Sequence, residues 1–112
     1  MQRMEPHLLL ISSFPDLAGA RRFAQALLEQ RLAACVNLLG PCTSMYRWQG
    51  AIETAEEVPI LIKTRASLYP GVEAELRRLH PYDVPELLAL PVEGGLPRYL
   101  DWIDAETQEA GA

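Results

Sequence analysis

The chain has 112 residues, a formal net charge of −5 at neutral pH and 49% hydrophobic residues. This length suffices for one hydrophobic core, so we expect a single domain over residues 1–112. The acidic balance and the lack of a basic stripe argue against a nucleic-acid partner, because phosphates require a positively charged face.

The first apolar run, HLLLIS, is much too short to cross a bilayer, and no small-residue cleavage pattern follows it. We therefore expect a cytoplasmic protein with no membrane partner. Cys35 and Cys42 are the only cysteines. Their odd separation places them on opposite faces of an extended strand, so we expect no disulfide between them.

The first third of the chain predicts a strand followed by a helix. Residues 7–13 form a short apolar run that ends in serines, which is typical of a buried strand. Pro15 breaks this run, and Asp16 is a candidate N-cap. Apolar residues then recur at helical spacing as far as Leu32, which predicts an amphipathic helix of about four turns.

The middle of the chain predicts paired strands. Residues 34–50 are rich in β-forming residues, and Gly40-Pro41 marks an internal bend. Gln49-Gly50 has the character of a hairpin turn, and residues 51–65 return as a strand.

A second helix is expected after Ser67, the candidate cap, with Pro70 in its first turn. Residues 87–92 predict a last buried strand, and the chain from Pro97 onward predicts a short C-terminal helix. The order corresponds to a ferredoxin-like βαββαβ two-layer sandwich of the α+β class. Right-handed crossovers place both main helices on one side of an antiparallel sheet.

The predicted sheet has a face that no main helix covers. A strand with one face in water should alternate apolar and polar residues. Residues 8–11, 58–62 and 87–92 are apolar at nearly every position instead. Because one short C-terminal helix is too small to shield a whole sheet, we expect other copies of the chain to cover this face.

Five segments carry a resemblance to a known family: RLAACVNLL (31–39), YRWQG (46–50), EEVPILIKT (56–64), LHPYDVPELLALPV (79–92) and YLDWI (99–103). Together they resemble the CutA family, which is named for divalent-cation tolerance. The resemblance extends over nearly the whole chain, with the motifs in the family's order. It implies a ferredoxin-like homotrimer whose sheets pack against one another across subunits. It implies no reaction, so we expect a non-enzymatic protein without catalytic residues or an obligatory cofactor.

The resemblance also implies copper or another divalent metal as a ligand. The metal would be held by a cysteine at the end of the first strand and a histidine before Pro-Tyr. His80 matches the histidine, whereas Ser12 stands where relatives often carry the cysteine. A hydroxyl is a poor ligand for a soft metal, so we expect weak binding. A second interpretation of His80 stays open, namely a cap at the C-terminal end of the second helix.

Four further residues match positions that line a cleft between neighbouring subunits in CutA relatives: Trp48, Lys63, Tyr82 and Glu86. Lys63 follows an apolar run, so it either extends to solvent or meets a carboxylate, for which Glu86 is the candidate. The small ligand of such a cleft is unknown from the sequence. The alternative function is a non-enzymatic signalling or scaffold trimer of the PII type that binds a small metabolite.

Overall fold

The structure is a computed structural model, and it describes residues 5–108. The elements in chain order are β1 (His7–Phe14), α1 (Leu17–Glu29), β2 (Cys35–Leu38), β3 (Cys42–Trp48), β4 (Ala51–Arg65), a 3₁₀ turn (Ala66–Leu68), α2 (Tyr69–Leu79), β5 (Leu88–Val92) and α3 (Pro97–Glu106). All strand pairs are antiparallel, and the sheet has the order β2-β4-β1-β5 with β3 paired to β4. The predicted α+β class is confirmed. The ends of the predicted domain, residues 1–4 and 109–112, lie outside the described residues.

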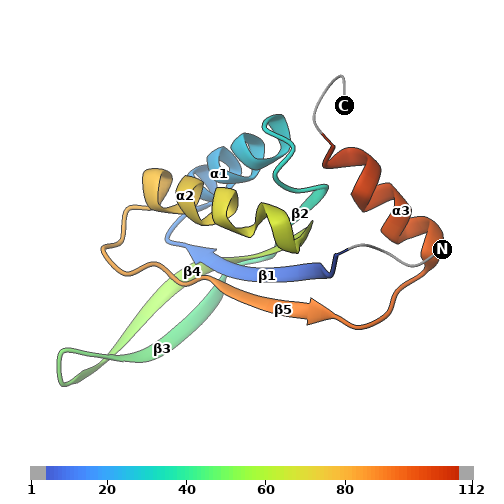
Figure 1. The fold of residues 1–112 in the computed structure, drawn as a ribbon. Helices are drawn as coiled ribbons and strands as arrows, with labels where there is room; N and C mark the ends of the chain where they lie inside the picture. Colours follow the sequence, from blue (N-terminus) through green and yellow to red (C-terminus); the bar gives the residue numbers. More distant parts are fainter. Residues whose placement is uncertain (1–4, 109–112) are drawn as a thin grey trace.

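The hydrophobic core lies between the sheet and the two helices α1 and α2, which cover the same side of the sheet (Figure 1). Strand alternation directs every second residue of β1 and β4 toward these helices. Leu10, Ile60 and Ile62 are fully buried there. They pack with residues from both helices: Ala20, Phe23, Leu27, Val72 and Leu76.

Helix α1 begins as predicted but ends earlier than predicted. The Asp16 carboxylate accepts a hydrogen bond from the Gly19 backbone N–H at 2.7 Å, which confirms the N-cap. The helix ends at Glu29 because Arg31 adopts a positive φ of 57° and turns the chain back. Leu32 therefore follows the helix, although it still packs against the core.

Helix α2 has no side-chain cap, so the predicted capping role of Ser67 is wrong. Ser67 lies in the 3₁₀ turn, and its backbone N–H and hydroxyl both donate to the Glu5 carboxylate, at 2.7 and 2.9 Å. Leu68 occupies the N-cap position of α2. Pro70 lies in the first turn, as predicted.

Strands β3 and β4 form a two-stranded arm, residues 42–57, that projects beyond the rest of the sheet (Figure 1). The predicted bend at Gly40-Pro41 separates β2 from β3, and both pair with β4 at different places. Gln49 and Gly50 have φ values of 49° and 83° and form the turn at the tip. The molecule is consequently elongated, 50 × 27 × 23 Å.

The face of the sheet opposite α1 and α2, called here the helix-free face, is apolar and only partly covered. Helix α3 is attached at one end of the sheet, where Asp104 lies 2.8 Å from His7 and Thr107 accepts a hydrogen bond from Arg65 at 2.8 Å. Leu88 and Leu90 of β5 stay 58% and 41% exposed. Helix α3 therefore covers one end of this face and leaves Leu88 and Leu90 exposed.

Candidate functional site

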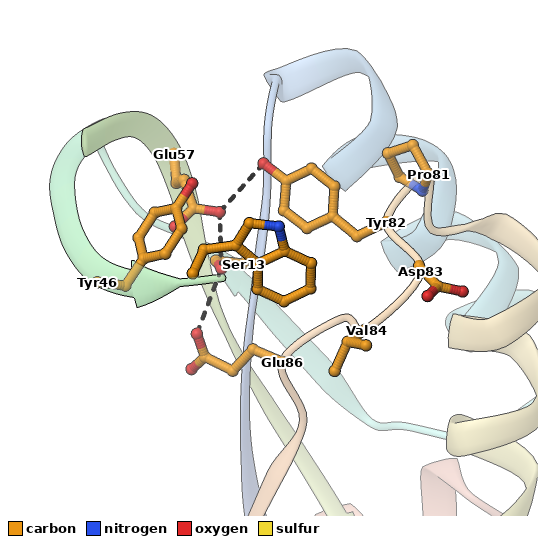
Figure 2. Close-up of a pocket in the computed structure, with 9 residues that line it drawn as sticks. Ser13, Tyr46, Glu57, Pro81, Tyr82, Asp83, Val84 and Glu86 are labelled. Atoms are coloured by element: carbon orange, nitrogen blue, oxygen red, sulfur yellow. Dashed lines mark hydrogen bonds between the residues drawn. The ribbon is translucent and has the colours of Figure 1, made fainter. Parts of the chain in front are cut away.

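A pocket of about 490 Å³ lies where the β3–β4 arm approaches the segment between α2 and β5 (Figure 2). Aromatic rings and carboxylates make up most of its wall, and we call it the acidic pocket. Its lining residues are Ser13, Tyr46, Trp48, Glu57, Pro81, Tyr82, Asp83, Val84 and Glu86. The volume lies within the range of roughly 300–1,000 Å³ that small-molecule sites occupy.

Strand alternation places the pocket-lining residues of the β3–β4 arm on one face of the arm. Tyr46 and Trp48 are two residues apart on β3, so both rings point to the same side, whereas Arg47 points to the other. Glu57 lies on the same side of the arm, because it pairs with Cys42 in the same register. The opposite wall of the pocket is formed by the segment that starts at Pro81. The ring of Pro81 restricts the backbone of this segment.

Two carboxylates converge on one hydroxyl inside this pocket (Figure 2). Ser13 Oγ lies 3.4 Å from Glu57 Oε2 and 3.3 Å from Glu86 Oε1, and Tyr82 Oη lies 3.4 Å from the same Glu57 oxygen. A serine carries one hydroxyl proton, so Ser13 donates to only one of the two carboxylates at a time. These contacts exceed the usual O–H···O range of about 2.5–3.0 Å. In residues 5–108, neither Glu57 nor Glu86 forms an ion pair.

The Tyr82 phenol interacts electrostatically with one of these carboxylates, that of Glu57. Burial raises the pKa of Tyr82 above its ordinary value of 10.0, and the neighbouring Glu57 charge raises this pKa further. Both effects disfavour the phenolate, since it is harder to hydrate when buried and is repelled by the carboxylate.

We expect the Tyr82 phenol to lose its proton above pH 10, and to do so at lower pH in Glu57→Gln, where the repelling charge is gone. Because the folded-state pKa is raised, the folded state retains a proton that the unfolded state loses. Its contribution to stability is therefore complete below pH 10 and is lost as pH rises through the folded-state pKa of Tyr82. Difference absorbance at 295 nm between the parent and Tyr82→Phe measures this titration. Identical Tyr82 curves with and without the Glu57 charge would contradict the assignment.

The structure brings together three of the four predicted cleft residues, namely Trp48, Tyr82 and Glu86. Lys63 lies apart from them. Its ammonium group donates to the Asn37 side-chain oxygen on the helix-free face, so its predicted pairing with Glu86 is not made within the chain.

The sequence-based prediction missed four functional candidates in the pocket: Ser13, Tyr46, Glu57 and Asp83. The alternation that places Tyr46 on the face of Trp48 was a usable signal. Nothing local in the sequence indicated that Glu57 faces Ser13, because the two residues are far apart in the chain.

His80 lies at the C-cap position of α2, as one of its two interpretations predicts, but the capping hydrogen bond comes from its backbone N–H, which donates to the Leu76 carbonyl oxygen at 2.8 Å. His80 is only 8% exposed, and its ring packs against that of Phe14 at a tilt of 39°, with ring centroids 4.3 Å apart. Nε2 lies 2.7 Å from the Ser13 carbonyl oxygen, and Nδ1 accepts a hydrogen bond from the Tyr82 backbone N–H at 3.1 Å. The neutral tautomer with a proton on Nε2 satisfies both contacts.

The donors predicted for copper are already engaged. Ser12 is fully buried, and its hydroxyl donates to the Glu86 carbonyl oxygen at 2.7 Å. Both ring nitrogens of His80 have backbone partners. No group of three or more His, Cys, Asp or Glu side chains is arranged for a metal within the described part of the chain. This donor set does not fit a soft metal, and the role of His80 and Ser12 as ligands stays a prediction.

The comparisons with known proteins agree over most of the chain. Residues 8–106 match the family model described as CutA1 divalent ion tolerance protein. The chain is 42% identical over 99 residues to the divalent-cation tolerance protein CutA of Thermus thermophilus, covering 88% of this chain and 96% of that protein. It is 48% identical over 94 residues to the mouse protein CutA, covering 84% of this chain and 53% of that protein, so it spans about half the mouse protein's length.

A solved structure shows the same fold. The periplasmic divalent cation tolerance protein CutA from Archaeoglobus fulgidus superposes with a TM-score of 0.88 at 40% identity, covering 91% of this chain and 99% of that chain. Family, sequence relatives and structure therefore agree with the resemblance that the motifs indicated. The chain belongs to the CutA1 divalent ion tolerance protein family.

Proposed function

We propose that the protein acts in divalent-cation tolerance as a homotrimer that binds divalent cations weakly in the acidic pocket, without catalysing a reaction. The observation that carries the proposal is the convergence of Glu57 and Glu86 on Ser13, with no ion-pair partner for either in residues 5–108. Carboxylate and hydroxyl oxygens suit hard divalent ions. Two carboxylates are few for such an ion, which makes the binding weak.

Trimer assembly is supported by two features of the fold. The β3–β4 arm is a two-stranded ribbon that projects from the sheet, and such a ribbon is only marginally stable in water on its own (Figure 1). The helix-free face also exposes Leu88 and Leu90. Both features favour contacts with further copies of the chain. The strand order β2-β4-β1-β5 supports the ferredoxin-like topology.

The non-enzymatic role is supported by the chemistry of the pocket wall. Its lining contains no histidine, cysteine or lysine, and the bases beside the Ser13 hydroxyl are the carboxylates of Glu57 and Glu86, whose contacts of 3.4 and 3.3 Å are longer than an ordinary O–H···O hydrogen bond. The cytoplasmic location stays a prediction, since the relative from Archaeoglobus fulgidus is described as periplasmic. In the described residues, every helix is too short or too polar to cross a membrane.

Titration with Mn²⁺, followed by electron paramagnetic resonance, tests the metal proposal. We expect a dissociation constant on the order of 10⁻⁴–10⁻³ M, as at other weak oxygen-ligand sites. The double variant Glu57→Gln/Glu86→Gln should weaken binding by at least about tenfold, because both charged ligands are lost. Glu56→Gln is the matched control, since Glu56 is exposed and accepts from Thr43 outside the pocket.

An unchanged Mn²⁺ affinity in the double variant would refute the pocket as the metal site. A parallel copper titration of His80→Phe separates the two candidate sites, because phenylalanine retains a stacking ring and removes both nitrogens. Copper binding that is lost in His80→Phe and retained in the double variant would place the metal at His80 instead.

A further inference from the structure

We propose that the acidic pocket is a binding site for primary alkylammonium ions, small organic cations with an N–H-bearing head and an apolar body. This inference rests on the cation-binding role proposed above and names the class of ligand that the pocket wall selects. Three features carry it: a mostly buried glutamate with one carboxylate oxygen that has no donor among residues 5–108, an aromatic wall, and the lack of any positive charge in the lining.

The carboxylate is that of Glu57, which is only 9% exposed. Its Oε2 atom has the long contacts to Ser13 and Tyr82. Within residues 5–108, no hydrogen bond reaches its Oε1 atom. Glu57 lines the pocket, so its Oε1 atom is available to a ligand that supplies a hydrogen-bond donor.

A primary ammonium group supplies the hydrogen-bond donors that the Glu57 carboxylate can accept. It carries three donors and one positive charge. Glu57 and Glu86 each lie within 3.4 Å of the same Ser13 hydroxyl, so a single ammonium placed beside Ser13 has two carboxylates in reach. Charge-assisted hydrogen bonds of this kind are stronger than those between neutral groups. A quaternary ammonium ion has the charge but no N–H group to offer.

The aromatic wall distinguishes an organic cation from a metal ion. Tyr46 and Tyr82 lie on either side of Glu57 (Figure 2), and Trp48 lines the same pocket; each of the three residues is between 41% and 44% exposed. Rings in this position attract ammonium groups through their negative faces and also bury an alkyl chain. A hydrated metal ion gains no comparable apolar contact. The wall therefore favours an alkylammonium ion over the divalent ions that the two carboxylates bind weakly.

The pocket also excludes anions. Its lining has three carboxylates and no lysine, arginine or histidine. Arg47, which stands between Tyr46 and Trp48 in the sequence, points away from the pocket because of strand alternation. A volume of about 490 Å³ is adequate for a ligand of several heavy atoms.

The fluorescence of Trp48 provides a direct test. The chain has two tryptophans, Trp48 and Trp102, so Trp102→Phe makes Trp48 the single reporter. Butylammonium chloride is added to this full-length protein, and butan-1-ol and butyltrimethylammonium chloride are the probes without charge and without N–H donors. We expect a saturable emission change with butylammonium, none with butan-1-ol at equal concentration, and at least about fivefold weaker binding of butyltrimethylammonium.

Variants locate the site. Glu57→Gln should weaken butylammonium binding by at least about tenfold, because the buried charged acceptor is lost, whereas Glu56→Gln should leave the affinity unchanged. Circular dichroism and sedimentation velocity verify that each variant keeps its fold and assembly. Equal responses to butan-1-ol and butylammonium, or no response of Trp48 to butylammonium, would overturn the proposal. The lack of a Trp48 response would also be observed if a neighbouring copy of the chain filled the pocket, and in that case too the proposal is wrong.

The two cation proposals fail separately. Mn²⁺ binding that depends on Glu57 and Glu86, together with no butylammonium binding, would overturn the ligand class and retain the metal role. Butylammonium binding without Mn²⁺ binding would overturn the metal role and retain the ligand class. If both bind, butylammonium should displace Mn²⁺ competitively, and simultaneous binding would contradict the shared site.

Discussion

Replacing Phe14 by alanine is expected to lower the free energy of unfolding by about 3–5 kcal/mol, a large part of a typical domain's stability. Phe14 is fully buried at the end of β1. Its ring lies 5.3 Å from that of Phe23 and 4.3 Å from that of His80, measured between centroids. Alanine would leave a cavity that the neighbouring helices cannot close fully. Guanidinium chloride unfolding at a fixed protein concentration, followed by circular dichroism, measures the loss.

The effect should extend from the core to the acidic pocket. The His80 ring packs against Phe14 and hydrogen-bonds the Ser13 carbonyl oxygen, so a cavity at Phe14 weakens the contacts that hold Ser13 in position. Phe14→Leu is the matched variant that keeps most of the volume, and we expect a markedly smaller loss. Leu17→Ala is the surface control, because Leu17 is 47% exposed. A loss in Phe14→Ala no larger than that in Leu17→Ala would show that Phe14 has little part in the core.

Introducing a charge on the helix-free face is expected to convert the proposed trimer into monomers at micromolar concentration. Leu88 of β5 pairs with Ile11, which in turn pairs with Leu61, and these residues share the helix-free face. A glutamate at position 88 would be solvated in a monomer, since Leu88 is 58% exposed. In a trimer that packs this face, the same charge would be buried without a partner, which is strongly unfavourable. Sedimentation equilibrium should report 12.5 kDa, the mass of one chain, instead of three times that mass.

Leu17→Glu is the matched control, because Leu17 is similarly exposed but lies on α1 in the helix layer. We expect it to remain trimeric. The unfolding midpoint of the parent protein should also rise with protein concentration, whereas that of a monomeric Leu88→Glu should not. A monomeric parent protein, or a trimeric Leu88→Glu with unchanged stability, would argue against assembly through this face.

Local patterns in the sequence were enough to predict the elements of the fold. Strand β4 spans residues 51–65 as expected, and the bend at Gly40-Pro41 and the turn at Gln49-Gly50 are where their residue types indicated. Apolar periodicity predicted these elements because it reflects which side of each element is buried. The apolar character of the helix-free face was readable for the same reason. Helix ends were harder, as Leu32 and Ser67 show, because they depend on single backbone angles and on distant partners such as Glu5.

The arrangement of the pocket depended on contacts between residues distant in sequence. Trp48, Tyr82 and Glu86 were identified from motifs, yet Glu57, the buried carboxylate between them, was not. Its position follows from the β3–β4 arm approaching the segment after α2, and strand periodicity does not encode that approach. Lys63 illustrates the same limit, since its partner proved to be an amide on the adjacent strand. Composition and periodicity thus determine layers and faces, whereas the tertiary packing of the arm decides which charges meet, because electrostatic partners are set by distances in space.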